Sequence, residues 1–423
     1  MRKYLIISLL ASYSIIFAGE SEDFKAVDNL YKERNFKAAL VESEKFLQKY
    51  PESKHQKSMR DKVAKIYFLE KNYKKAEEIF KRLYTIEEKQ SQKDEYASYL
   101  ARANALLNNS DSAMFYVREI KDKKIFQKTF FAVAQNFLAK ENNEAAQKAY
   151  KEIIDNKYEN YKESMMGLGI VYYNLKDYDK AIYWLSEFSK AVPNENKEMV
   201  SYLRASAIYR KGSTDEAIKY FEKLANMTPA SEYSRKAALY LIEIHSNRKD
   251  EAKVSFYLEK LKGTKEYNTA MTMIGDLHVT KGNYEKALDY YNQSNDKNNP
   301  KLIYGEAYSL YKNGQYEEAL KKFESLKNSD YYNQSIYHIF AINYKLKNFD
   351  EIIRNREIIR KVVVSQIDTD NIIRIIANSA YQVGNYKLAK DYYGRLFAVS
   401  PDKENLFRVI LLDSQMLDME DLR

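Results

Sequence analysis

The chain contains nearly the same ten residues twice, as GNYEKALDYY from Gly282 to Tyr291 and as GNYKLAKDYY from Gly384 to Tyr393. The core of this motif is an aromatic residue, two further residues and then Ala, and it recurs through the sequence with a few weaker matches. We call its last position the mark. The marks are Ala39, Ala76, Ala113, Ala146, Ala181, Ala217, Ala252, Ala287, Ala319, Ile352 and Ala389. They span 350 residues in ten intervals, a mean of 35, and a period near 34 is typical of helix-turn-helix repeats.

Residues at fixed distances from the mark predict two helices in each unit. Eight units have a small residue twelve positions before the mark: Ala64, Ala101, Ala134, Gly169, Ala205, Gly275, Ala307 and Ala377. Two helices approach closely only where the side chains at their crossing are small, so a first helix A should cross a second helix B, which holds the mark. Gly212, Gly282, Gly314 and Gly384, each five positions before a mark, indicate the turn between them. Four of the five prolines lie twelve positions after a mark, where helix B should end.

One unit, MMGLGIVYYNLKDYDKAIYWLSEFSKAVP from Met165 to Pro193, resembles a tetratricopeptide repeat, with Gly169, Tyr172, Ala181 and Pro193 at the positions that mark this family. The resemblance covers roughly residues 24–401. It implies an all-α fold, a right-handed superhelical solenoid of about eleven helix-turn-helix repeats, in which helices A line a concave groove that binds protein or peptide. We expect a signal peptide over residues 1–18, the solenoid over 19–401 and a C-terminal capping helix over 402–423.

The N-terminus has the pattern of a secretory signal peptide. Arg2 and Lys3 precede an apolar stretch of 14 residues, and the small and acidic residues AGESED follow it, which predicts cleavage after Ala18. The alternative is an uncleaved anchor, but a spanning helix needs about 20 apolar residues. No other segment is apolar enough to span a membrane. The sequence therefore predicts an exported protein, periplasmic or envelope-associated, that is soluble after cleavage.

Composition and motifs argue against an enzyme. The absence of cysteine excludes disulfides, thiolate metal sites, a cysteine nucleophile and a lipid-modified N-terminal cysteine. The 69 Lys and Arg are interleaved with 60 Asp and Glu, which argues against a nucleic-acid surface. The four histidines His55, His245, His278 and His338 lack metal-ligand spacing, and the glycines of Gly167–Gly169 lie inside a predicted helix. We expect no catalytic residue, no cofactor and no metal.

A stripe of tyrosines is the candidate partner-binding surface. The members lie mainly eight positions before a mark, on the helix A surface expected to face the groove. They are Tyr173, Tyr202, Tyr209, Tyr304, Tyr308, Tyr311, Tyr344 and Tyr381. Tyrosine is a common anchor residue of interfaces because it buries a large area at a low cost in entropy. Two interpretations stay open: the tyrosines serve packing alone, or they line a groove that also binds a partner.

The N-terminal repeat LYKERNFKAALVESEKFLQKYPESK resembles repeats of bacterial envelope-assembly proteins. This resemblance implies an exported scaffold that binds a protein or peptide in cell-envelope assembly or maintenance. The alternative is a glycan-binding module that stacks peptidoglycan sugars on the groove tyrosines.

Overall fold

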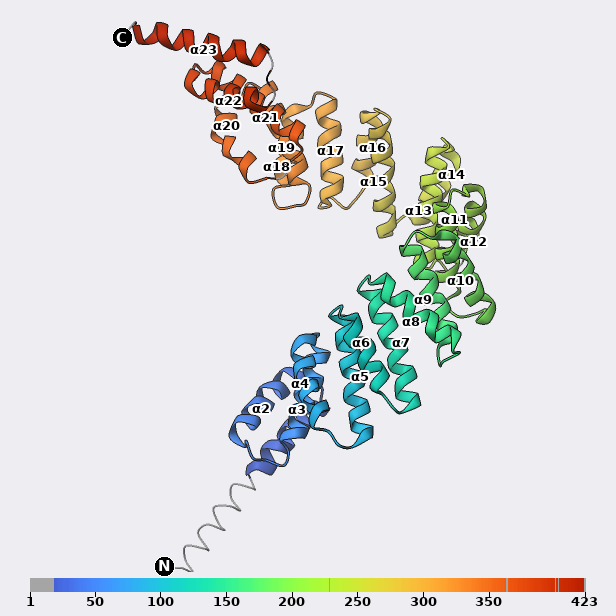
Figure 1. Ribbon diagram of the computed structural model, residues 1–423. Coiled ribbons are helices and arrows are strands. Elements are labelled where there is room, and N and C mark those ends of the chain that lie inside the picture. The colour runs from blue at the N-terminus through green and yellow to red at the C-terminus, as the bar shows by residue number, and fades with distance from the viewer. Residues whose placement is uncertain (1–18, 228, 363, 400, 402, 422–423) are drawn as a thin grey trace, which may run out of the picture. The chain divides into compact units, whose positions relative to one another are not determined.

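The computed structural model describes residues 19–421 except 228, 363, 400 and 402; the predicted signal peptide of residues 1–18 lies outside the described residues. The described residues form helices and turns and contain no strand. Within each of two compact units, consecutive helices pair as antiparallel hairpins that stack side by side (Figure 1). The predicted fold class, an all-α solenoid of helix-turn-helix repeats, is confirmed.

Each hairpin consists of a helix A and a helix B. The first hairpin pairs the helix of residues 19–32 with α2 (Phe36–Lys49). The next five are α3 (Gln56–Leu69) with α4 (Tyr73–Ile86), α5 (Gln90–Leu106) with α6 (Ser110–Glu119), α7 (Lys123–Ala139) with α8 (Asn143–Asp155), α9 (Tyr161–Asn174) with α10 (Tyr178–Ala191), and α11 (Lys197–Arg210) with α12 (Thr214–Ala225).

The remaining hairpins are α13 (Glu232–Asn247) with α14 (Glu251–Leu261), α15 (Lys265–Thr280) with α16 (Tyr284–Gln293), α17 (Pro300–Lys312) with α18 (Tyr316–Ser325), α19 (Tyr332–Lys345) with α20 (Phe349–Arg354) and η1 (Arg356–Arg360), and α21 (Gln366–Gln382) with α22 (Tyr386–Val399). A last helix, α23 (Lys403–Asp421), packs on α22. The chain divides into two compact units, an N-terminal unit that ends at Tyr220 and a C-terminal unit that begins at Phe221.

The turn between helices A and B has the same backbone in all these hairpins. One residue takes a left-handed conformation, with φ between +58° and +99°. These residues are Arg34, Lys71, Asn108, Glu141, Lys176, Gly212, Lys249, Gly282, Gly314, Lys347 and Gly384. The next residue donates its backbone N–H to the carbonyl five positions earlier, as Asn72 does to Tyr67 at 2.8 Å and Asp177 to Tyr172 at 2.9 Å. This bond pattern ends helix A, and the same polar residue starts helix B as its N-cap.

The burial of the marks confirms ten of them and corrects one. Nine marks with Ala are fully buried, and Ile352 is 2% exposed. Ala252, by contrast, is exposed, and the buried residue is Val254, five positions after the left-handed Lys249. The prediction at Ala252 was wrong because the turn determines the phase: in each of these hairpins the buried mark lies five positions after the left-handed residue, and here that position is Val254.

The predicted close crossing of helices A and B is confirmed at the glycines. A Cβ on Gly275 would lie 2.4 Å from Cε1 of Tyr291, four positions after the mark Ala287. On the other side of the same ring, a Cβ on Gly305 of the next helix A would lie 2.4 Å from the Tyr291 hydroxyl. Tyr291 is fully buried and donates to Oδ1 of Asp276 at 2.7 Å. One tyrosine therefore fills the space between two successive helices A because both have glycine there.

Candidate functional site

Three of the predicted tyrosines lie together on α17. Tyr304, Tyr308 and Tyr311 share one helix face because they are spaced by four and three residues. All three contact the ring of His338 on α19, the next helix A, at centroid distances of 6.3, 5.4 and 5.4 Å. His338 itself stacks on Phe323 of α18 at 5.1 Å and 14°. The tyrosine stripe thus packs one repeat against the next.

The electrostatics of this cluster keep His338 neutral. Burial lowers the pKa of His338 to about 4, Lys312 acts in the same direction, and Asp368 opposes them. Its buried Nδ1 has no hydrogen-bond partner among the described residues. Burial also raises the pKa of Tyr304 and Tyr311. At neutral pH the imidazole is therefore one more uncharged ring in an aromatic cluster.

A pocket of about 520 Å³ opens beside the cluster, and we call it the tyrosine pocket. Three successive helices A supply most of its wall. Its lining residues are Tyr311, Tyr337, Ala341, Tyr344, Lys345, Lys347, Phe349, Ile375 and Gln382. These residues include two lysines and no carboxylate. The pocket therefore offers aromatic faces and positive charge, a combination suited to an acidic segment with apolar side chains.

The other predicted tyrosines lie elsewhere. Tyr381, 36% exposed, is at the end of α21 and does not line this pocket. Tyr173 on α9 and Tyr202 and Tyr209 on α11 are half-buried residues of the N-terminal unit. The structure thus brings together Tyr304, Tyr308, Tyr311 and Tyr344 within the C-terminal unit. Their role in partner binding stays a prediction.

The aromatic residue eight positions before the mark also has a packing role. It contacts the aromatic residue three positions before the mark, across the turn, with centroid distances of 5.4–5.9 Å. The pairs are Tyr31–Phe36, Phe68–Tyr73, Tyr173–Tyr178, Tyr311–Tyr316, Tyr344–Phe349 and Tyr381–Tyr386. Packing accounts for the recurrence of these residues, and only their exposed edges remain for a partner.

The sequence did not single out His338, Lys345 or Lys347. His338 lies fourteen positions before the mark Ile352. In two other units, the residue fourteen positions before the mark also contacts an aromatic residue of the preceding repeat. Tyr99 meets Phe68 at 5.3 Å, and the Lys62 ammonium lies 5.9 Å from the Tyr31 ring. If the residue fourteen positions before each mark had been compared with the aromatic residues of the preceding repeat, the sequence would have predicted this contact.

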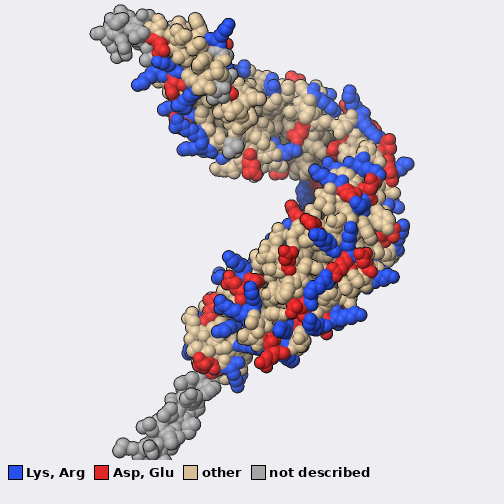
Figure 2. All heavy atoms as spheres, viewed as in Figure 1, with Lys and Arg blue, Asp and Glu red and all other residues tan. Residues whose placement is uncertain are grey.

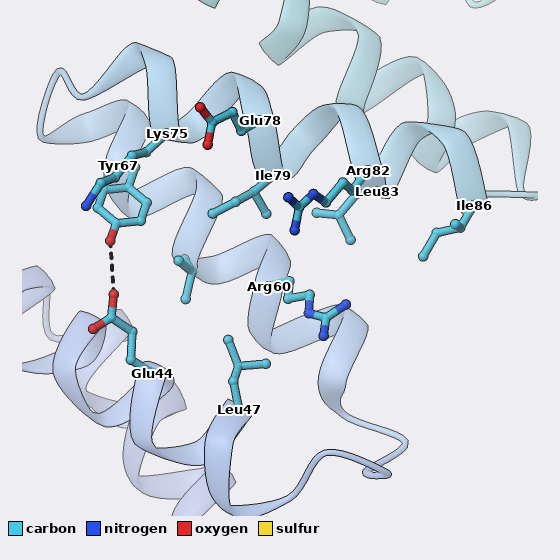
Figure 3. Close-up of a pocket in the computed structure, with 11 residues that line it drawn as sticks. Glu44, Leu47, Arg60, Tyr67, Lys75, Glu78, Ile79, Arg82, Leu83 and Ile86 are labelled. Atoms are coloured by element: carbon cyan, nitrogen blue, oxygen red, sulfur yellow. Dashed lines mark hydrogen bonds between the residues drawn. The ribbon is translucent and has the colours of Figure 1, made fainter.

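A second pocket, of about 340 Å³, lies in the N-terminal unit between α2, α3 and α4 (Figure 3). We call it the arginine pocket. Buried Val63 and Leu83 line it together with the more exposed Leu47, Ile79 and Ile86. At one end the Tyr67 hydroxyl donates to Oε1 of Glu44 at 3.0 Å.

Two arginines give the arginine pocket its charge. Arg60 of α3 and Arg82 of α4 line the pocket, and neither makes a hydrogen bond or ion pair with the described residues. Lys75 is held 5.0 Å from the Tyr67 ring, so its charge lies at the Tyr67 end. Glu78 also lines the pocket and offsets part of this positive charge. The surface is therefore mixed, without the aromatic wall of the tyrosine pocket.

Within residues 19–421, gaps aside, no group of three or more His, Asp or Glu side chains could hold a metal ion. In that same part of the chain, no helix combines the length and the apolar character needed to cross a membrane.

Two stretches match family models of the tetratricopeptide repeat, residues 131–196 and residues 269–296. The chain contains tetratricopeptide repeats. The first stretch includes α8, α9 and α10, and the second includes α16 with the motif GNYEKALDYY. Tetratricopeptide repeats are typical of non-catalytic scaffolds that bind other proteins on an extended surface.

No curated protein matches this chain in sequence. Among solved structures it is similar to yeast Tom70, with 11% identity, a TM-score of 0.36 and coverage of 95% of this chain and 96% of that one. The Cut9–Hcn1 hetero-tetramer of the APC/C has 12% identity and a TM-score of 0.31, with 93% and 96% covered. A tetratricopeptide repeat protein from Parabacteroides merdae has 11% identity and a TM-score of 0.39, with 68% and 98% covered.

Proposed function

We propose that this protein is a non-enzymatic scaffold whose tyrosine pocket binds a segment of a partner protein. The observation behind the proposal is the lining of that pocket. Tyr311, Tyr337 and Tyr344 offer ring surface that is already held by packing, so little entropy is lost on binding. Lys345 and Lys347 add positive charge with no carboxylate among the lining residues. The bound segment should therefore place an apolar or aromatic side chain beside an acidic one.

The scaffold is proposed to act outside the cytoplasm, in assembly or maintenance of the cell envelope. The support is the signal-peptide pattern of residues 1–18 and the resemblance of the N-terminal repeat to envelope-assembly proteins. Fractionation of cells that produce the full chain, compared with a chain in which Leu9→Arg and Ile15→Arg interrupt the apolar stretch, tests this part. Export of only the unaltered chain is expected, and cytoplasmic retention of both would contradict it.

Binding at the tyrosine pocket is tested by crosslinked co-purification from the native envelope. Tyr311→Ala and Tyr344→Ala should each lower recovery of a given crosslinked partner by at least tenfold, and Lys347→Glu should do so without removing a ring. Tyr183→Ala is the matched control, because Tyr183 is 55% exposed on α10, a helix B. Circular dichroism confirms that each variant is folded.

Equal recovery with all four variants would show that the tyrosine pocket is not the binding surface. A parallel pull-down with purified cell-wall sacculus addresses the alternative of glycan binding. If the sacculus is retained, and Tyr311→Ala and Tyr344→Ala abolish retention, the ligand is the glycan and the protein-binding proposal is wrong.

A further inference from the structure

The arginine pocket is an open groove between two helices B. Its walls are α2 and α4, and α3 lies between them (Figure 3). On α4 the residues Ile79, Leu83 and Ile86 form an apolar row, because positions i, i+4 and i+7 share one helix face. Leu83 is buried, whereas Ile86, at the last position of the helix, is 61% exposed. Apolar surface along this row is therefore still in contact with water.

The charged residues of the groove are divided between its two ends. Because α3 runs antiparallel to α4, Arg60 near the start of α3 lies at the same end as Arg82 near the end of α4, as Figure 3 shows. The two acidic lining residues, Glu44 and Glu78, lie toward the opposite end, where Glu44 accepts from Tyr67. The arginine end therefore combines positive charge with apolar surface.

The two arginines differ from most basic residues around them in having no acidic partner. Figure 2 shows Lys and Arg interspersed with Asp and Glu over the visible face of the N-terminal unit. Arg118 of α6, for example, donates to Glu152 of α8 at 2.5 Å. Arg60 and Arg82 form no such pair with the described residues. Their guanidinium groups are therefore available to a carboxylate of another molecule.

We propose that the arginine pocket binds an amphipathic helix of a partner protein, whose apolar row lies against α4 and whose acidic side chains meet Arg60 and Arg82. A guanidinium group donates two parallel hydrogen bonds to a carboxylate, and the apolar wall beside it excludes water from the pair. The site belongs to the N-terminal unit, whereas the tyrosine pocket belongs to the C-terminal unit. Binding at the arginine pocket is therefore independent of binding at the tyrosine pocket.

The lining favours a helix over an extended segment or an acyl chain. Apart from Tyr67, the uncharged lining residues are all aliphatic, and none is Ser, Thr, Asn or Gln. An extended segment would leave its backbone N–H and C=O groups without partners along this wall, whereas a helix satisfies its own. An acyl chain has no polar backbone, but in a groove as open as the exposure of Ile86 indicates it would stay partly in water.

Two labelled synthetic peptides of about 18 residues, or about five helical turns, test the proposal by fluorescence anisotropy with the full chain. Both peptides have leucine at positions i, i+4 and i+7 of a helix that is otherwise Ala and Gln. They differ only at two positions at one end of this row, which are glutamate in the first peptide and lysine in the second. The glutamate peptide should bind at least tenfold more tightly than the lysine peptide.

Charge reversal locates the binding. Arg60→Glu and Arg82→Glu should each lower the affinity for the glutamate peptide at least tenfold, and the double variant should prefer the lysine peptide. Both side chains are exposed, so the fold should tolerate the changes, which circular dichroism checks. Arg34→Glu, at an exposed arginine outside the pocket, is the matched control and should leave both affinities unchanged. Lys347→Glu in the tyrosine pocket should leave them unchanged as well, which separates this test from that of the proposed function.

Equal affinity for the two peptides, no binding of either, or a preference that survives both arginine substitutions would overturn the proposal. Vesicles of phosphatidylglycerol address a lipid as the occupant, and their binding should not depend on Arg60 and Arg82. If the vesicles bind the unaltered chain but not the double variant, and the glutamate peptide does not compete with them, the occupant is a lipid headgroup and the proposal is wrong.

Discussion

At the scale of the residue, glycine and tyrosine act as complementary shapes. Tyr291 occupies a space that exists because Gly275 and Gly305 have no side chain, and Tyr150 packs in the same way on Gly167, where a Cβ would lie 2.4 Å from its ring. The ring of Tyr291 cannot yield to an added methyl group, because glycines on two helices and the bond to Asp276 hold it. The stability of these repeats therefore depends on single methyl groups at the helix crossing.

The substitution Gly275→Ala measures this dependence. Overpacking should outweigh the gain in helix propensity and lower the free energy of unfolding by about 1–2 kcal/mol. Gly394→Ala is the control, since a Cβ on Gly394 in α22 would meet no atom within 4 Å. This variant should be neutral or more stable by up to about 1 kcal/mol. Urea denaturation of both variants gives the comparison, and equal effects would contradict the packing of Tyr291.

The corrected mark gives a second pair of substitutions. Ala319→Leu adds volume at a fully buried mark and should cost about 1–3 kcal/mol, whereas Ala252→Leu adds it at an exposed position and should change stability by less than about 0.5 kcal/mol. Thermal melts followed by circular dichroism measure both. A large loss of stability in Ala252→Leu would indicate that Ala252 is buried, as the sequence predicted, and would contradict the structure at this turn.

At the scale of the element, the repeated turn determines where each hairpin bends. The motif GNY supplies a left-handed Gly and an Asn N-cap, at Gly282–Asn283 and again at Gly384–Asn385. The two caps differ in one bond: the Asn385 side chain accepts from the backbone N–H of Leu388 at 3.2 Å, whereas Asn283 makes no such cap bond. The same two residues therefore stabilise two helices unequally.

Asn385→Ala should cost about 1 kcal/mol because it removes a cap bond, and Asn283→Ala should cost about half of that or less. Hydrogen exchange at the first turn of α22 and of α16 measures each effect locally. Equal losses at both sites would show that the N-cap conformation, and not the side-chain bond, determines the stability of helix B.

The sequence predicted the hairpins because each turn and each mark is a local pattern. Seven turns use a left-handed residue other than glycine, such as Lys71 or Glu141, and only the distance to the mark locates those. At Ala113, Ala146 and Ala252 neither the aromatic residue nor a glycine was present, so Ala was the only signal for the phase; it lies at the buried position in the first two units and not in the third. The tyrosine pocket could not be predicted in the same way, since it forms from residues of three repeats, and the packing distance of helices A decides which side chains converge.

At the scale of the whole molecule, the two units should differ in how their stability responds to acid. His245, His278 and His338 all belong to the C-terminal unit, and burial lowers the pKa of each. A histidine with a lowered pKa binds its proton more readily in the unfolded chain, whose pKa is about 6.5. The stability that it contributes is complete above pH 6.5 and is lost as pH decreases toward the pKa of the folded state. The N-terminal unit has only His55 among its described histidines.

The C-terminal unit should therefore lose stability first when the pH is lowered from 6.5 to 4.5. His338, with a pKa of about 4, contributes a slope that approaches but does not exceed about 1.4 kcal/mol per pH unit, which amounts to roughly 2 kcal/mol over this window. Hydrogen exchange followed by mass spectrometry at pH 6.5, 5.5 and 4.5, with exchange times corrected for the intrinsic rate, compares the two units in one molecule. His338→Phe keeps an uncharged ring against Phe323 and should remove most of this slope, while His55→Phe should leave it unchanged. Equal slopes in the two units, or an unchanged slope in His338→Phe, would mean that His338 is not held neutral by the aromatic cluster of Tyr304, Tyr308 and Tyr311.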